Sequence, residues 1–230
     1  YKDYNEALRK DPNAKRPLPE KLNDLELGWR FACERMSLNL NAYYMSYIDQ
    51  LVLTGKLNDT GYAIRENVGS SYRAGIELDA QLKLSDKWQW QPTITLSTNK
   101  NKSYRNAQVD NAGNTTIVDW GSTQLSYSPN VIAGNKLTFA PIKGFAASWE
   151  AKYVGKQYID NTERDEAKLD AYFVNNLQLQ YELTPRKWCR SVLFSVAANN
   201  FLNAKYVPYG DVYGYIPAAE ANFLGGITIG

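Results

Sequence analysis

A strict two-residue alternation of side-chain type from residue 72 to residue 84 constrains the fold of this chain more than any other feature. The apolar positions are Tyr72, Ala74, Ile76, Leu78, Ala80, Leu82 and Leu84, and the positions between them are Arg73, Gly75, Glu77, Asp79, Gln81 and Lys83. A helix would scatter these side chains around its circumference, whereas a strand sends them to two opposite faces. The alternation therefore predicts a long strand with one apolar and one polar face.

Eight further segments follow the same pattern, so the chain is predicted to be all-β with about nine antiparallel strands. In the segment 88–99 the apolar row is interrupted by Pro92, which cannot donate to a ladder and lies near one strand end. The nine predicted strands are 25–31, 38–44, 72–84, 88–99, 131–139, 145–153, 173–183, 192–198 and 223–229. Strands in globular proteins average roughly 5–6 residues, whereas a tilted membrane-spanning strand needs roughly 9–11. Strand length therefore favours a membrane β-barrel.

The connections between these strands alternate between short and long. The short ones are 32–35, 85–87, 140–144 and 184–190, and the long ones are 54–67, 100–130, 155–170 and 203–220. Outer-membrane barrels have short periplasmic turns and longer extracellular loops. The alternation predicts that all short turns lie at one end of the sheet and all long loops at the other.

Aromatic residues, which make up 13% of the chain, gather near both predicted strand ends. The short-turn group is Trp29, Phe31, Trp88, Trp90, Phe139, Phe145, Tyr181 and Trp188, and the long-loop group is Tyr44, Tyr47, Tyr72, Tyr153, Tyr172 and Phe173. Two aromatic girdles are typical of barrels in a bilayer.

Composition excludes several classes of function. The chain has no histidine, which removes Ser-His-Asp and Cys-His catalysis, histidine-ligated zinc and proximal-histidine haem. The formal charge of +2 gives no basic excess for nucleic acid. We therefore expect no enzyme, no cofactor, no metal and no nucleic-acid partner. Cys33 and Cys189 fall at two short turns that are six strands apart, too far for the roughly 7 Å that a disulfide spans, so we expect no bond between them.

Four segments, taken in order, resemble the barrel of TonB-dependent outer-membrane receptors. The most specific is Asn199, Asn200, Phe201, Leu202, Asn203 and Tyr206, a variant of the Asn-Leu-Phe-Asp/Asn signature that follows an apolar strand near the end of these proteins. The others are the entry segment 17–28, the strand segment 66–78 and the segment 151–161 with its Tyr-x-Gly-x-x-Tyr pattern. The resemblance covers residues 17–230, and the Asn-, Tyr- and Lys-rich loops are similar to those of receptors from the Bacteroidetes.

The resemblance implies that the chain is the C-terminal portion of a roughly 22-stranded transmembrane β-barrel with a plugged lumen. Residues 1–21 would form an extracellular loop and residues 22–230 the strands, with the N-terminal plug outside this chain. Members of the family import scarce nutrients (iron siderophores, haem, cobalamin or glycans) across the outer membrane of Gram-negative cells with energy from TonB. The implied partners are membrane lipid and lipopolysaccharide, the plug and remaining strands, the TonB complex through the N-terminal part, and a small-molecule nutrient.

The long loops are the predicted substrate-binding surface, because loops on a rigid scaffold carry function. The candidate contacts are Tyr104, Arg105, Trp120, Tyr127, Tyr209, Tyr213 and Tyr215, since tyrosine-rich loops bind ligands through stacking and hydroxyl hydrogen bonds. The alternative is that these aromatic residues pack the loops against one another. Segment 109–115 is predicted to be a hairpin tip, and the acidic segment 160–166 to be a solvated loop rather than a calcium site.

Two other classes of protein remain open on sequence grounds. One is a complete small outer-membrane barrel of structural role. The other is a soluble β-sandwich module that binds carbohydrate.

Overall fold

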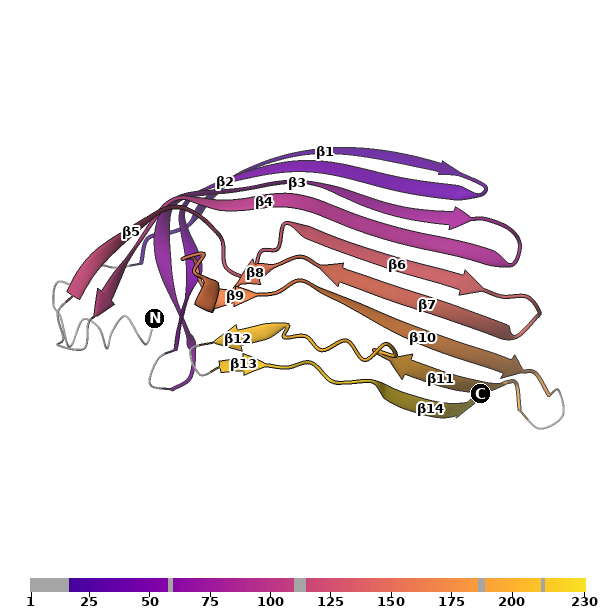
Figure 1. The fold of residues 1–230 in the computed structure, drawn as a ribbon. Helices are drawn as coiled ribbons and strands as arrows, with labels where there is room; N and C mark the ends of the chain where they lie inside the picture. Colours follow the sequence, from indigo (N-terminus) through magenta and orange to yellow (C-terminus); the bar gives the residue numbers. More distant parts are fainter. Residues whose placement is uncertain (1–16, 58–59, 110–114, 186–188, 212–213) are drawn as a thin grey trace.

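The computed structural model describes residues 17–57, 60–109, 115–185, 189–211 and 214–230. The main sheet is antiparallel, with strands in the order β1-β2-β3-β4-β6-β7-β10-β11-β14 and with β5 paired to β4 (Figure 1). Its strands are β1 (Lys21–Cys33), β2 (Met36–Leu57), β3 (Ala63–Lys83), β4 (Trp88–Val109), β5 (Thr115–Gln124), β6 (Val131–Phe139), β7 (Phe145–Val154), β10 (Tyr172–Leu183), β11 (Val192–Asn199) and β14 (Asn222–Ile229). Among the described residues, no helix is long and apolar enough to cross a membrane.

All nine predicted strands are present, and the short turns gather at one end of the sheet and the long connections at the other (Figure 1). The prediction was wrong about the extent of the first two long loops. Strands β2, β3 and β4 each run for 21 or 22 residues, and β5 adds a strand inside the predicted loop 100–130. These extensions pair with each other beyond the end of the neighbouring strands, so their backbone groups are satisfied without the rest of the sheet.

The other two long connections contain short elements of their own. Connection 155–170 holds β8 (Gln157–Tyr158), the 3-10 helix η1 (Asp165–Ala167) and β9 (Lys168–Leu169), and β8 pairs with β9. Connection 203–220 holds β12 (Tyr209–Asp211) and β13 (Gly214–Ile216), which pair only with each other in the described part of the chain. The hairpin predicted at 109–115 agrees with the pairing of β4 with β5, whose last described partners are Val109 and Thr115.

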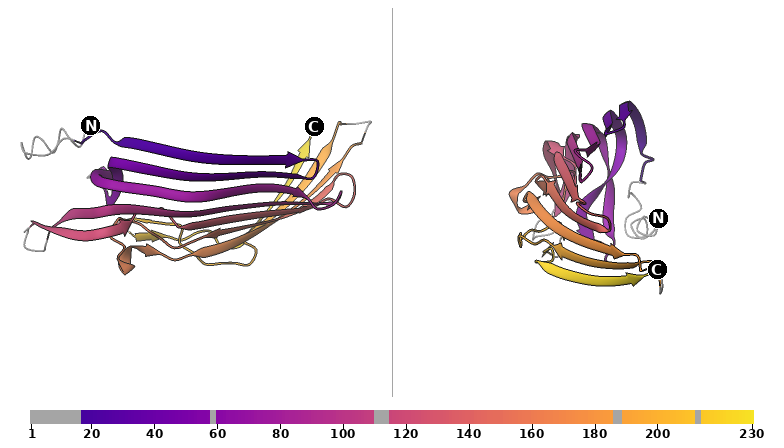
Figure 2. Two further views of the ribbon diagram at one scale, coloured as in Figure 1. Left: turned by 90° about the horizontal axis from the view of Figure 1, so that it is seen from above. Right: turned by 90° about the vertical axis from the view of Figure 1, so that its right-hand side faces the viewer.

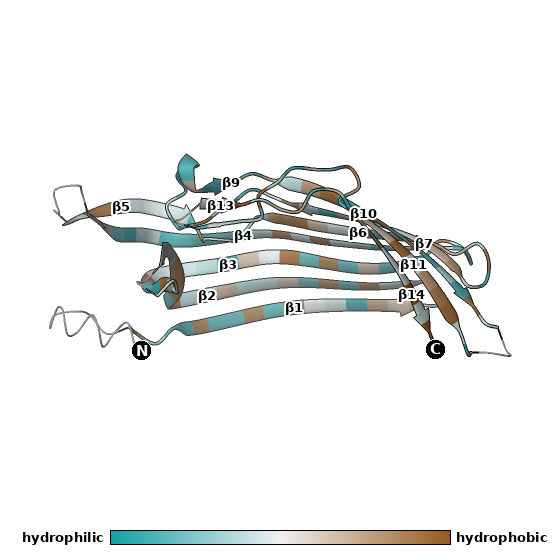
Figure 3. Cartoon of the chain, turned by 90° about the horizontal axis from the view of Figure 1, so that it is seen from below, coloured by the Kyte–Doolittle hydropathy of each residue, from teal (hydrophilic) through white to brown (hydrophobic). Residues whose placement is uncertain are grey.

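The register carries the two-residue alternation across the sheet. One rung of cross-strand partners runs through Leu27, Ala42, Ile76, Leu96 and Val131, all of them apolar. Along β1 the alternation appears as teal and brown bands (Figure 3). The apolar face stays exposed: Leu27 is 76% exposed and Ile76 52%. Exposed apolar surface of this extent marks a surface built for an apolar environment.

The opposite face carries the polar side chains. A second rung runs through Asn39, Asp79, Thr93, Gly134 and Lys152, and Asn39 donates a hydrogen bond to Asp79. The alternation therefore gives the sheet an apolar face and a hydrated polar face, as a membrane barrel requires.

Aromatic pairs mark both ends of the apolar face. Trp88 stacks on Phe139 with ring centroids 4.3 Å apart at the short-turn end, and Tyr44 stacks on Tyr72 at 6.2 Å toward the long connections. Two members of the predicted girdles lie elsewhere: Tyr47 and Tyr172 occupy alternate positions that belong to the polar face. Trp188 lies outside the described residues.

Two tryptophan–asparagine pairs occupy the apolar face. Trp90 lies opposite Leu137 and donates its indole N–H to Oδ1 of Asn135, two residues away on β6, at 2.5 Å. Trp149 lies opposite Leu177 and donates to Oδ1 of Asn175 at 3.0 Å. Each pair joins two polar groups that an apolar environment would otherwise leave without partners. The bond from Trp90 satisfies Oδ1 of Asn135, which interrupts the apolar alternation of its strand, whereas the buried Nδ2 of the same amide has no partner among the described residues.

The sheet curves into an open trough whose two edges are β1 and β14 (Figure 2). In hydrocarbon, an edge strand would leave backbone donors and acceptors unpaired, so further strands are needed to close the wall. The two cysteines are both free, as predicted.

From these edges we predict that the 230-residue chain alone will not form a closed barrel in detergent. On an unheated gel it should migrate as unfolded protein, with no heat-modifiable folded species. A compact species that shifts on boiling would show that β1 and β14 can pair with each other.

We predict opposite outcomes for arginine at two adjacent positions in the full-length protein. Ile76→Arg places a charge on the apolar face and should lower the free energy of unfolding by roughly 2–4 kcal/mol. Glu77→Arg, on the polar face, should change it by less than about 0.5 kcal/mol. Denaturant titrations of the refolded protein measure both, and equal effects would contradict the assignment of the two faces.

Candidate functional site

The four long connections build one layer at the end of the sheet, here called the loop layer: residues 49–69, 100–130, 155–171 and 200–221. It contains all the predicted ligand contacts, apart from Tyr213, which lies outside the described residues. The layer has its own apolar core of Val52, Val68, Tyr104 and Leu125, with Trp120 packed against it. The connections are therefore folded against one another rather than separate.

Tyr104 is the centre of that core and is 1% exposed. Its hydroxyl donates to Oε1 of Glu66 on β3 at 2.8 Å. Burial, with the nearby carboxylate of Glu66, raises the pKa of Tyr104 well above its usual value, so the donor stays protonated at physiological pH. Tyr104 was a predicted ligand contact, but its ring is enclosed within the chain and packs the loops, as the alternative interpretation held.

Asn161 joins three of the four connections. It is fully buried, and its Nδ2 donates to the backbone oxygen of Leu53 at 2.6 Å. Its Oδ1 accepts from the backbone N–H of Ser126 at 2.9 Å and from Nδ2 of Asn101 at 3.5 Å. One amide side chain thus satisfies groups on β2, on β4 and in the connection after β5.

The acidic segment 160–166 is packed in its first half and exposed in its second, so the prediction of a solvated loop holds only for residues 164–166. Asp160 accepts from Thr162 and from Arg164, and its residue is 8% exposed. Oε1 of Glu163 accepts from Nζ of Lys100 at 3.0 Å and from the backbone N–H of Gln124 at 2.6 Å. The carboxylate of Glu163 thus fastens the connection 155–170 to β4 and β5, while that of Asp160 orders the connection itself.

Trp120 and Arg105 lie on the β4–β5 hairpin. The indole of Trp120 donates to Oδ1 of Asn106 at 3.0 Å, and the guanidinium of Arg164 lies 5.8 Å from its ring centroid. Arg105 lies opposite Asp119 across the hairpin. The two side chains are exposed to solvent and form an ion pair in which Nη2 of Arg105 lies 2.7 Å from Oδ2 of Asp119. The guanidinium is exposed, so a ligand could reach it.

Tyr127, Tyr209 and Tyr215 form the contact between the last connection and the rest of the layer. Tyr127 stacks on Tyr209 with centroids 5.5 Å apart, and its hydroxyl donates to the backbone oxygen of Gly210. The hydroxyl of Tyr215 donates to the backbone oxygen of Glu166. Tyr209 is 43% exposed and Tyr215 49%, so both present ring surface to the outside.

The asparagine-rich signature forms a network of hydrogen bonds at the base of this last connection. Asn200, buried and with a φ of 47°, donates from Nδ2 to Ala204 O and Ala219 O and accepts from Ala204 N. Asn203, with a φ of 53°, accepts from the backbone N–H of Ala221 at 2.9 Å. Asparagine tolerates this left-handed backbone better than most residues.

The remaining signature residues lie next to this hydrogen-bond network. Nδ2 of Asn199, the last residue of β11, donates to Oδ1 of Asn222 on β14 at 3.0 Å. The backbone N–H of Phe201 donates to the oxygen of Asn175, and Tyr206 stacks on Tyr172 at 4.3 Å. Phe201 and Leu202 are exposed. The signature fixes how the chain leaves one strand and returns to the next, which is a structural role.

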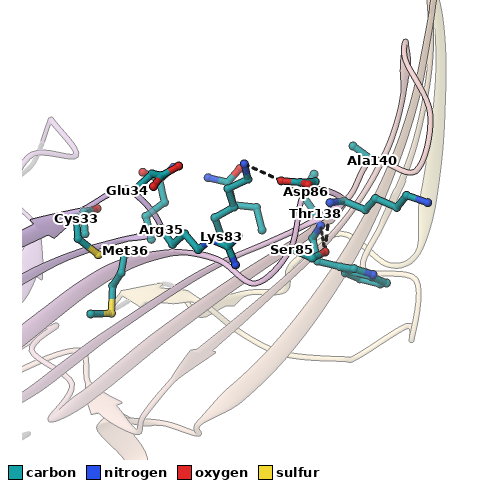
Figure 4. Close-up of a pocket in the computed structure, with 14 residues that line it drawn as sticks. Cys33, Glu34, Arg35, Met36, Lys83, Ser85, Asp86, Thr138 and Ala140 are labelled. Atoms are coloured by element: carbon teal, nitrogen blue, oxygen red, sulfur yellow. Dashed lines mark hydrogen bonds and ion pairs between the residues drawn. The ribbon is translucent and has the colours of Figure 1, made fainter.

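Two depressions lie at opposite ends of the sheet. One of about 350 Å³ in the loop layer is lined by Lys168, Leu169, Asp170, Ala171, Lys205, Tyr206, Val207 and Tyr215. The other, of about 380 Å³, lies among the short turns and is shown in Figure 4. There Lys83 forms a 3.0 Å ion pair with Asp86, and Cys33 and Met36 line the rim. Only the first depression contains a predicted ligand contact, Tyr215. Among the described residues no three His, Cys, Asp or Glu side chains gather in a way that could hold a metal ion.

Sequence reasoning missed the residues that hold the loop layer together: Asn161, Asn101 and Glu66. Each lies in a polar stretch with no periodic pattern, and the bonds that join it to another connection or strand span 35 to 108 residues along the chain. The signal that was available is weak: a run of asparagine and acidic residues beside a Tyr-x-Gly-x-x-Tyr pattern.

We predict that Asn161→Ala in the full-length protein loosens the loop layer without unfolding the sheet. It leaves half-buried backbone groups of Leu53 and Ser126 unpaired, and each should cost about 1 kcal/mol, the low end for an unsatisfied group. Amide hydrogen exchange should accelerate in residues 50–53 and 122–127 and stay unchanged in β10 and β11. The matched control is Asn23→Ala on the exposed β1; equal exchange in both variants would contradict the role of Asn161.

Comparison with known proteins agrees with this architecture. The family model described as "TonB dependent receptor-like, beta-barrel" matches residues 5–201. Curated protein sequences gave no match. The fold is similar to that of the ferric-catecholate import receptor Fiu from E. coli K12, with 20% identity, a TM-score of 0.64, and coverage of 90% of this chain and 27% of that one.

Two further solved structures show the same likeness. The siderophore receptor PiuA from Acinetobacter baumannii has 18% identity and a TM-score of 0.69, with coverage of 91% of this chain and 28% of PiuA. The copper transporter OprC has 18% identity and a TM-score of 0.66, with coverage of 94% and 33%. The chain spans about a third or less of the length of each of these three proteins. With the open antiparallel sheet, its apolar face and the family match over most of its length, the chain belongs to the TonB-dependent receptor β-barrel family.

Proposed function

We propose that this chain forms wall and extracellular capture loops of an outer-membrane importer that takes up a scarce nutrient with energy from TonB. The nutrient class we favour is an iron siderophore, ahead of haem, cobalamin or a glycan. The wall faces lipid and lipopolysaccharide, and a plug with the remaining strands completes the barrel. The segment binds and guides the nutrient and catalyses no reaction, so the protein acts as a transporter rather than an enzyme.

The observation that carries this proposal is the apolar face of the sheet. It crosses all nine strands, remains exposed, and ends in aromatic pairs at both sides, so it suits a bilayer and no aqueous surface. A soluble β-sandwich would bury this face against a second sheet. In the described part of the chain the second sheets are the two-stranded pairs β8–β9 and β12–β13, which cannot cover it.

The proposed ligand surface is the exposed part of the loop layer. Tyr209 and Tyr215 present ring faces, and Arg105 presents a guanidinium whose partner Asp119 is also exposed. Aromatic faces and a cationic fork on one layer suit a planar, oxygen-rich and anionic molecule. Ferric siderophores with aromatic chelating groups have this chemistry, and Fiu, the ferric-catecholate receptor, is among the structures with the same fold.

We predict that deleting the gene that encodes the full-length receptor abolishes uptake of one class of nutrient only. Strains would be supplied with radiolabelled iron as catecholate, hydroxamate or haem complexes, with cobalamin, or with glycans as sole carbon source. Uptake should stop equally in a strain without TonB and after addition of a protonophore. Uptake that persists in either condition would contradict the proposed energy coupling, and unchanged uptake of every nutrient would contradict the importer.

A pair of variants tests the ligand surface. The double variant Tyr209→Ala/Tyr215→Ala should weaken binding of the transported ligand roughly 10–100-fold, since each aromatic contact contributes about 0.5–1.5 kcal/mol. The matched control, Tyr153→Ala, removes an exposed tyrosine from the apolar face and should leave affinity unchanged. Equal affinities in both variants, at equal expression in the membrane, would place the ligand elsewhere.

A further inference from the structure

The short turns at one end of the sheet differ in their charge. Turns 33–36 and 84–88 each contain one acidic and one basic residue. Turn 140–144 contains Lys143 and no acidic residue, and connection 184–191 contains three basic residues and no acidic one. The short-turn end of β7, β10 and β11 therefore carries positive charge that no acidic residue of these turns balances.

Lys143 and Arg190 lie on either side of the end of β10. The strand order is β7-β10-β11 (Figure 1), with Lys143 two residues before β7 and Arg190 two residues before β11. Both side chains are exposed, and in the described part of the chain neither forms an ion pair. Strands β7 and β11 are two strand spacings, or roughly 10 Å, apart. Two long cationic side chains can therefore approach one group between them.

The backbone holds both cations in place. Next to Lys143, the oxygen of Gly144 accepts from the backbone N–H of Glu182 on β10 at 2.7 Å. Gly144 has a φ of 83°, and a Cβ at this position would collide with the backbone oxygen of Glu182, so the turn closes tightly on β10. The backbone N–H of Arg190 donates to the oxygen of Gly230 at 2.8 Å, which joins it to the end of β14. The spacing of the two cations across β10 is thus set by the sheet.

The apolar face next to these cations is aromatic. Phe145, Tyr181 and Phe194 are direct cross-strand partners on β7, β10 and β11. Tyr181 and Phe194 are each 40% exposed. Glu182 belongs to the polar face by alternation, so its carboxylate does not neutralise the cations on this side. Tyr181, on the strand between the two cations, adds a hydroxyl to an otherwise apolar row.

This arrangement combines two kinds of recognition. Two cations and a hydroxyl suit a phosphate group, which accepts charge-assisted hydrogen bonds. A row of aromatic side chains at the edge of an apolar face suits the upper part of acyl chains. An anionic phospholipid offers both features in one molecule, whereas the ammonium group of a zwitterionic headgroup would be repelled by the two cations.

We propose that Lys143, Arg190 and Tyr181 form a binding site for an anionic phospholipid in the membrane leaflet at the short-turn end, which in outer-membrane barrels is the periplasmic one. The phosphate lies between the two cations, and the acyl chains lie along Phe145 and Phe194. The site rests on the proposed contact of the apolar face with the outer membrane, and it is independent of the nutrient that the protein takes up.

The test uses the full-length protein in detergent, titrated with phosphatidylglycerol or with phosphatidylethanolamine of the same acyl chains and followed by native mass spectrometry. The wild type should prefer phosphatidylglycerol. Lys143→Gln/Arg190→Gln should weaken its binding about 10–30-fold, since each cation near a lipid surface contributes about fivefold. Tyr181→Phe should weaken it about two- to tenfold, the effect of one hydrogen bond. Binding of phosphatidylethanolamine should stay the same in both variants.

The matched control is Arg35→Gln/Lys87→Gln, which removes one arginine and one lysine from the other two short turns and should keep the affinity for phosphatidylglycerol. Equal loss in this control, equal affinity of the wild type for the two lipids, or displacement by inorganic phosphate as effective as by phosphatidylglycerol would overturn the site. Insertion into phospholipid vesicles is measured in parallel. A protein that inserts without preferring phosphatidylglycerol overturns the lipid site alone, whereas a protein that fails to insert overturns the proposed membrane wall as well.

Discussion

The structure depends on one constraint: a strand that faces hydrocarbon must find partners for its backbone groups in neighbouring strands and for its side chains in lipid. The antiparallel ladder from β1 to β14 meets the first requirement for every strand except the two at the edges. The two-residue alternation meets the second. Because both requirements apply to every residue of a strand, they leave a strong pattern in the sequence, and they also force the wall to continue beyond β1 and β14.

The loop layer obeys a different rule. Outside the hydrocarbon, water can satisfy backbone groups. The connections therefore do not need to alternate apolar and polar side chains, and they can adopt irregular structure. They do so around few residues: the core at Tyr104, the amide of Asn161 and the carboxylate of Glu163.

The same distinction explains how much the sequence could predict. All nine strands, their order along the chain and the two ends of the sheet followed from local alternation, which Tyr72 to Leu84 shows without exception. The strand extensions were missed because residues 49–57 and 100–109 mix polar and apolar side chains. The role of Asn161 was missed because its partners Leu53 and Ser126 are 108 and 35 residues away, and the local sequence around it carries only a weak signal. Tyr104 and Tyr209 look alike in sequence, and only the packing shows that one is enclosed and the other exposed.

The tryptophan–asparagine pairs on the apolar face have a consequence for assembly. Alternation opposes a slip of one residue between neighbouring strands, because such a slip would turn polar side chains into the lipid. It does not oppose a slip of two residues, which returns every side chain to its own face. A two-residue slip that brings Phe139 opposite Trp90, or Leu179 opposite Trp149, would separate each indole from its asparagine and leave both polar groups unpaired in hydrocarbon. The opposite slip would place each asparagine directly across from its tryptophan. The two pairs therefore oppose a two-residue slip in one direction, an error that the hydrophobic pattern by itself does not exclude.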